Sequence, residues 1–182
     1  MFRDNSLIPT EAVRLAALGL LAEAPRHYGD LAAEIRHFTS RIAGPSLDLM
    51  GTSLELLRYE GLVAAIGGSG MADNAMLEIT PAGNTALQAL LKAHLRAPLG
   101  DYNRLALLLK LRFLPLLPAP EQHEQMTHIG QSLESELVRL EDLRRHNAAP
   151  GPFRDWLDQD IAALQARLAL WHGHTPKERA AE

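Results

Sequence analysis

The segment from Ile42 to Ile79 constrains the fold of this chain more than any other part of the sequence. Apolar residues in its first part are three, four and three positions apart, a spacing that places them on one side of a helix. They are Leu47, Met50, Leu54 and Leu57. Glu60-Gly61 is expected to end this helix, and the apolar run at 62–66 is typical of a buried strand.

A glycine-rich loop follows that strand, and a second strand follows the loop. The loop contains Gly67, Gly68 and Gly70, and the strand at 76–79 places Leu77 and Ile79 on one face. A helix followed directly by a two-stranded hairpin is the arrangement of a recognition helix and its wing. The sequence therefore predicts a winged helix-turn-helix, a shape that binds DNA.

Helical periodicity accounts for most of the remaining chain. Before this segment we expect helices at 10–23 and 30–42, the second with Asp30 as its N-cap. After it, Thr80 as N-cap and Pro81 at the first position open a helix that continues to about residue 96. The stretch at 97–100 contains proline and glycine and is the predicted domain boundary. Further helices are expected at 102–114, 121–146 and 152–171.

The predicted fold is mostly α with a small β-wing. It comprises a winged helix DNA-binding domain at 1–97 and a C-terminal helical dimerisation domain at 98–182. The apolar stripes of the two long C-terminal helices need further surface to be buried, and two-fold dimers are the commonest soluble oligomers. We therefore expect a homodimer held by these helices. The alternative is an intramolecular helical hairpin packed on the helix at 80–96.

Composition limits the possible functions. The chain has no cysteine, which excludes disulfides and thiolate metal sites. The pattern of a signal peptide and the roughly 20 apolar residues of a membrane span are both missing, so we expect a cytoplasmic protein. The net charge is −4, with 8 Lys and Arg against 10 Asp and Glu in residues 1–97. Attraction to DNA phosphates is therefore expected to be weak and sensitive to salt.

Several motifs together resemble the PadR family of bacterial transcriptional regulators, and the resemblance covers most of the chain. The segments that carry it are Ala17–Ala22, His27–Gly29, Glu60–Val63, Leu77–Gly83, Leu111–Pro115 and Ile161–Leu168. The resemblance implies a dimeric, DNA-binding repressor whose C-terminal helices hold the dimer and, in some members, a small effector.

The chain departs from this family where DNA would be contacted. Gly51 stands where the family usually has a tyrosine, and the predicted wing contains Asp73 and no basic residue. Asp48 and Glu55, on the outward side of the predicted recognition helix, oppose the DNA backbone. DNA binding is therefore predicted mainly from shape, and the alternative is a winged-helix dimer that binds a protein instead of DNA.

The candidate DNA contacts are polar residues of the predicted recognition helix, nearby arginines and the wing glycines. Ser46, Thr52 and Ser53 could reach base edges or phosphates, and the alternative is a helix cap and two solvated side chains. The arginines could bind phosphates or be ordinary surface charges; they are Arg36, Arg41 and Arg58. Gly67, Gly68 and Gly70 permit a wing tip that could enter a minor groove.

Three aromatic residues form a predicted effector pocket at the dimer interface. Phe113, Trp156 and Trp171 could enclose a small planar effector, as the resemblance implies, although ordinary helix packing is the alternative. None of the eight histidines has a metal-site spacing, and neither a phosphate loop nor a nucleophile elbow is present. We expect no metal, no cofactor and no enzymatic activity.

The sequence thus predicts a PadR-like transcriptional regulator that acts as a homodimer on a short inverted repeat. We expect it to be a repressor. Its expected partners are operator DNA, a second copy of itself and the planar effector.

Overall fold

The computed structural model describes residues 9–42, 50–66, 75–95, 101–147 and 150–174. Its N-terminal half contains α1 (Pro9–Glu23), α2 (Tyr28–Ile42), α3 (Met50–Tyr59) and α4 (Pro81–Lys92). The strands β2 (Val63–Ile66) and β3 (Met76–Ile79) lie between α3 and α4. The predicted fold class, mostly helical with a small wing sheet, is confirmed.

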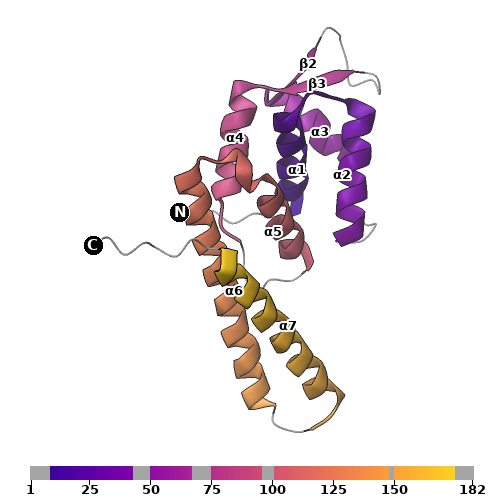
Figure 1. Cartoon of the computed structure of the whole chain (residues 1–182). Coiled ribbons are helices and arrows are strands. Elements are labelled where there is room, and N and C mark those ends of the chain that lie inside the picture. Colours follow the sequence, from indigo (N-terminus) through magenta and orange to yellow (C-terminus); the bar gives the residue numbers. More distant parts are fainter. Residues whose placement is uncertain (1–8, 43–49, 67–74, 96–100, 148–149, 175–182) are drawn as a thin grey trace, which may run out of the picture.

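The described part of the C-terminal half consists of helices and the short turns between them. It contains α5 (Asp101–Phe113), a 3-10 turn η1 (Leu114–Leu116), α6 (Ala119–His146) and α7 (Pro152–His174). In Figure 1, α6 and α7 run side by side away from the winged half, and α5 lies between the two halves.

The sheet contains a third strand that sequence reasoning missed. β1 (Arg26–His27) pairs antiparallel with β3, and β3 also pairs with β2, so the strand order is β1-β3-β2. The predicted N-cap at Asp30 is wrong, because α2 already begins at Tyr28. The cause is the strand pairing, since the Tyr28 N–H continues the ladder by donating to the Ala75 carbonyl over 2.9 Å.

The predicted N-cap of α4 is confirmed and also connects the sheet to the end of α3. Thr80 Oγ1 accepts a hydrogen bond from the Gly83 N–H at 3.0 Å, as an N-cap side chain does. The same hydroxyl donates to the Gly61 carbonyl at 2.8 Å. Gly61 has a φ of 73°, a left-handed conformation that glycine adopts without strain and that ends α3.

The main core is built around α1. Leu15, Ala17 and Leu18 are fully buried there, and α3, α4 and α5 all pack against this helix. The Phe113 ring of α5 lies against Gly19, where a Cβ atom would come within 2.6 Å of ring carbons. Helix α5 therefore packs in the N-terminal core although it follows the predicted boundary at 97–100.

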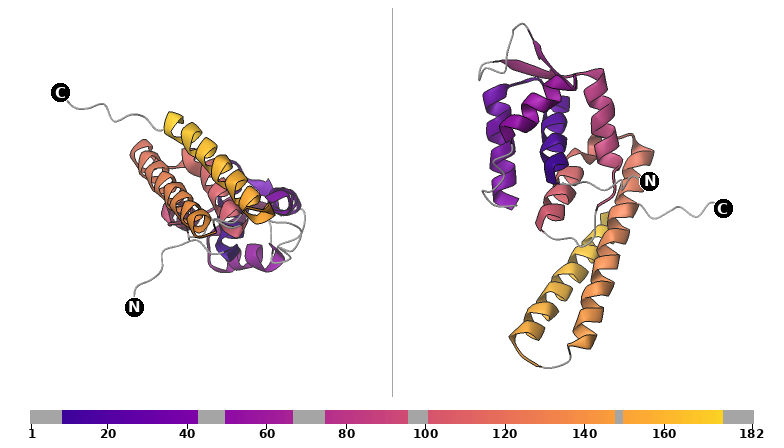
Figure 2. Two further views of the ribbon diagram at one scale, coloured as in Figure 1. Left: turned by 90° about the horizontal axis from the view of Figure 1, so that it is seen from below. Right: turned by 180° about the vertical axis from the view of Figure 1, so that it is seen from behind.

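Helices α6 and α7 form an antiparallel hairpin within one chain, as Figure 2 shows from two further sides. Ile129 and Leu133 of α6 pack with Leu164 and Leu168 of α7 in a second, smaller core. The intramolecular hairpin, expected as the alternative to a dimer, is therefore present. None of the helices in the described ranges is long and apolar enough to cross a membrane.

Candidate nucleic-acid interface and interhelical cavity

Helix α3 buries one side and exposes the other. Leu54 and Leu57 are buried, as the apolar spacing predicted, whereas Glu55 and Leu56 are exposed and Tyr59 is 90% exposed. The side chains of Thr52 and Ser53 lie outside the described residues, and so do Ser46 and the wing glycines Gly67, Gly68 and Gly70. The described part of the outward side is thus acidic and apolar rather than basic.

Several arginines of the winged half are neutralised by internal ion pairs. Arg14 of α1 pairs with Glu60. Arg26 contacts Glu34 at 2.8 Å, and Arg112 of α5 contacts the same carboxylate at 3.0 Å. These guanidinium groups join α1 to the end of α3 and join β1 and α5 to α2, and they offer little charge to a ligand.

The three arginines predicted from the sequence differ from these. Arg36 and Arg41 are exposed on α2, and Arg58 is half-buried in the last turn of α3. Within the described residues none of the three takes part in an ion pair with a carboxylate. They are therefore positive charges of the helix-turn-helix that remain available to phosphates.

Sequence reasoning missed Leu56 and Tyr59, because it considered only polar and charged residues on the outward side of the helix. Both residues fall outside the apolar stripe of Leu54 and Leu57, and this position alone predicts that their side chains are exposed. An exposed tyrosine can donate a hydrogen bond to a phosphate, and an exposed leucine can contact a thymine methyl group.

A cavity of about 440 Å³ lies between α5, α6 and α7. Trp171 forms part of its wall, and its indole N–H donates to the Met126 carbonyl at 3.1 Å. Gly130 of α6 allows the indole to lie there, since a Cβ atom at this position would be 3.1 Å from Trp171 Nε1. The indole is thus fixed in place before any ligand arrives.

The three predicted effector residues are not brought together. Trp171 lines this cavity, whereas Phe113 is buried in the main core against Gly19 and Arg112. Trp156 is 68% exposed on α7, outside the cavity.

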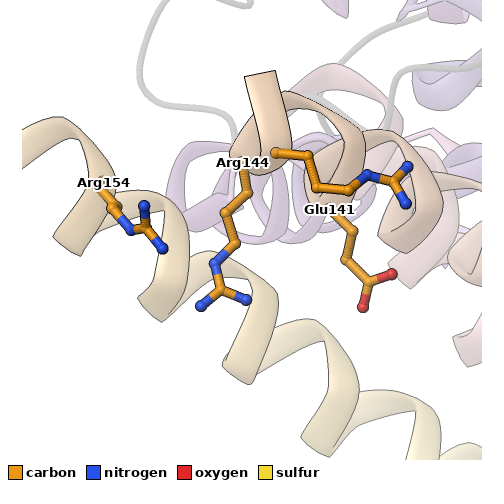
Figure 3. A pocket seen from close by; sticks show the side chains of 4 residues that line it. Glu141, Arg144 and Arg154 are labelled. Atoms are coloured by element: carbon orange, nitrogen blue, oxygen red, sulfur yellow. The ribbon is translucent and has the colours of Figure 1, made fainter. Parts of the chain in front are cut away.

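A second cavity, of about 430 Å³, lies at the far end of the hairpin and is lined by Glu141, Arg144, Arg145 and Arg154 (Figure 3). Each arginine there has an acidic partner. Arg144 contacts Asp158 at 2.5 Å, Arg154 contacts the same residue at 3.9 Å, and Arg145 contacts Asp142 at 3.1 Å. Its charges are balanced within the hairpin, so this cavity is not suited to binding an anion.

Lys110 is a further residue that the sequence did not single out. It is 1% exposed, and its ammonium group donates to the Ala93 carbonyl at the end of α4 and to Gln125 Oε1 of α6, the latter at 2.9 Å. Burial lowers the pKa of Lys110 from 10.5 to about 8. Lys110 thus connects the winged half to the hairpin at a cost in desolvation.

The N-terminal half has a winged-helix fold, and one side of α3 is exposed on it. The chain matches, over residues 2–174, the family model described as "Putative AphA-like transcriptional regulator", and it belongs to that family. The predicted class, a transcriptional regulator, is confirmed. No match was found among curated proteins.

Among solved structures the chain is similar to PadR of Bacillus subtilis. The complex with operator DNA shares 19% identity over 87% of this chain and 98% of that chain, with a TM-score of 0.39. The complex with p-coumaric acid shares 17% identity over 92% and 99% of the two chains, and PadR alone shares 17% over 92% and 98%. The TM-score is 0.42 for both.

Proposed function

We propose that this regulator binds double-stranded operator DNA through α3 and the arginines beside it. The observation that carries the proposal is the contrast among the arginines. Arg14, Arg26 and Arg112 are held in internal ion pairs, whereas Arg36, Arg41 and Arg58 form none with the residues that the structure describes. Unpaired arginines on the two helices of a helix-turn-helix are placed to neutralise phosphates and so to fix the position of α3 on the duplex.

In this proposal α3 enters the major groove and the wing lies along the backbone or the minor groove. Ser46, Thr52 and Ser53 remain the proposed polar contacts, and Gly67, Gly68 and Gly70 the proposed wing tip. Leu56 and Tyr59 join them on the exposed side of α3.

The proposed assembly is a homodimer whose C-terminal region, 98–182, joins two winged domains, 1–97. Five large apolar side chains on the hairpin are exposed to between 42% and 68%: Val138, Leu143, Phe153, Trp156 and Leu170. Such exposure is typical of a surface that a partner covers. Two copies of α3 about 34 Å apart would match successive major grooves, hence an inverted repeat. In this proposal the bound dimer represses transcription. An effector that changes the spacing between the two copies of α3 releases the dimer from DNA.

Replacement of Arg58 tests the interface. In fluorescence anisotropy with the promoter of its own gene, the R58A variant should bind about tenfold more weakly than the wild type, because two phosphate contacts are lost per dimer. The matched control is R145A, since Arg145 is 71% exposed at the far end of the hairpin and should leave binding unchanged. Equal affinities of R58A and R145A would contradict the assignment of Arg58.

One observation supports a second candidate, a winged-helix dimer that binds a protein. The described outward side of α3 presents Glu55, Leu56 and Tyr59, and Ile66 of β2 is also 44% exposed. An acidic and apolar surface is suited to a protein partner as much as to DNA. A wild-type protein that binds neither its own promoter nor a shuffled fragment at low salt would favour this candidate.

A further inference from the structure

The cavity between α5, α6 and α7 combines an apolar interior with positive charge. Leu107, Leu111 and Leu133 contribute aliphatic surface, and Arg104 and Arg167 also line it. No aspartate or glutamate is among the described residues that line it. Its volume of about 440 Å³ lies within the range of small-molecule sites in proteins, roughly 300–1,000 Å³.

The two arginines carry charge that no described acidic residue neutralises. Within the described residues, neither Arg104 nor Arg167 forms an ion pair, and both are exposed. The cavity at the far end of the hairpin provides the contrast, because each of its arginines has an acidic partner. A guanidinium beside an apolar cavity binds a carboxylate well, since it donates two parallel hydrogen bonds.

The geometry points to this cavity as the binding site of an aliphatic carboxylate, with the chain among the leucines and the carboxylate on Arg104 and Arg167. Aliphatic lining favours a saturated chain over a flat ring, because the described wall contains a single aromatic residue, Trp171. Phe113 and Trp156, which could have supplied a second aromatic surface for a ring to stack on, lie elsewhere.

The position of the cavity gives such a ligand a regulatory effect. Arg104 and Leu107 belong to α5, which packs on α1, whereas Arg167 and Trp171 belong to the hairpin. A ligand held by both sides would set the angle between the hairpin and the winged half. Only this regulatory effect rests on the proposed function. The binding of the carboxylate to the cavity requires no DNA.

Sodium decanoate is the probe for the test, with 1-decanol and decyltrimethylammonium as neutral and cationic compounds of equal chain length. Binding to the full chain is followed by the fluorescence of Trp171 in a W156F background, below the critical micelle concentrations of the two ionic compounds and below the solubility limit of 1-decanol. We expect one decanoate per protomer, bound about tenfold more tightly than 1-decanol, because a charge-assisted pair adds to the same apolar contact. Decyltrimethylammonium should bind more weakly than either.

The double variant R104A/R167A should lose the preference for decanoate and keep the affinity for 1-decanol. The control R145A should behave as the parent protein, and circular dichroism melts show whether each variant is folded. Equal affinity for decanoate and 1-decanol in the parent, or no saturable binding, would overturn the inference. A decanoate-induced fall from dimer to monomer in sedimentation velocity would also overturn it, because the cavity would then be an interface between copies.

If DNA binding fails in the promoter assay while decanoate still binds one to one, the proposed function is wrong and this site stands. If the R104A/R167A protein binds decanoate as the parent does while the promoter is still bound, the site is wrong and the function stands.

Discussion

The G83A variant should lose most of the stability of the winged half, a loss of at least about 3 kcal/mol in the free energy of unfolding. Gly83 is buried in the first turn of α4, where an added Cβ atom would overlap the Leu62 carbonyl oxygen. It would also lie 2.7 Å from Cγ1 of Ile79. The Leu62 carbonyl cannot withdraw easily, because it already accepts a hydrogen bond from the Thr80 N–H at 3.1 Å.

Urea unfolding followed by circular dichroism measures this loss. The matched control is G173A, the same substitution near the end of α7, where a Cβ atom meets nothing within 4 Å. That variant should be as stable as the wild type or slightly more stable, since alanine is the better helix former. If G83A and G173A unfold at the same urea concentration, the close approach of α4 to the end of α3 does not exist.

Lys110 should make stability depend on pH in an unusual direction. Burial lowers its pKa from 10.5 to about 8, so the folded protein holds this proton less tightly than the unfolded chain does. Below pH 8 the lysine is charged in both states, and folding carries the full cost of burying the charge. The cost declines between pH 8 and 10.5 and is absent above that range. A fall from 10.5 to about 8 corresponds to about 3 kcal/mol.

The K110M variant isolates this effect, since all other titrating groups are shared with the wild type. Between pH 7 and about pH 9.5, the free energy of unfolding of the wild type should rise relative to that of K110M by about 2 kcal/mol. Chemical denaturation of both proteins across this range provides the measurement. A difference between them that stays constant with pH would show that Lys110 keeps its ordinary pKa.

Local signals in the sequence were sufficient for much of the fold. Thr80-Pro81 predicted the start of α4, because an N-cap and a proline at the first position act within one turn. β1 could not be predicted in this way, since two residues, Arg26 and His27, become a strand only by pairing with Met76 and Leu77. That pairing lies some 50 positions away along the chain and moved the start of α2 from Asp30 to Tyr28.

The candidate site was harder to predict than the fold. Arg36, Arg41 and Arg58 were chosen for their places on predicted helices, yet Arg14 and Arg26 have the same chemistry and are held by Glu60 and Glu34. Whether an arginine forms an ion pair depends on how the helices pack, and this packing could not be predicted from local sequence patterns.

Helix packing also decides the environment of the charged residues of α5. Lys110 and Arg104 lie six positions apart, and packing buries the first at the end of α4 while it leaves the second beside a cavity. The aromatic residues of the predicted effector pocket were chosen by residue type, and packing separated them. Their residue type suggested one site, but packing placed Phe113 in the core and left Trp156 exposed.

A salt series of binding to the promoter of its own gene tests the central claim most directly. Three arginines that pair with no described carboxylate, in each protomer of the proposed dimer, offer about six phosphate contacts, so the logarithm of the binding constant should fall with the logarithm of salt concentration at a slope of about −5. A shuffled fragment of equal length should bind far more weakly at each concentration. Absence of promoter binding even near 20 mM salt, where screening is weakest, would contradict the claim that this protein regulates transcription by binding DNA.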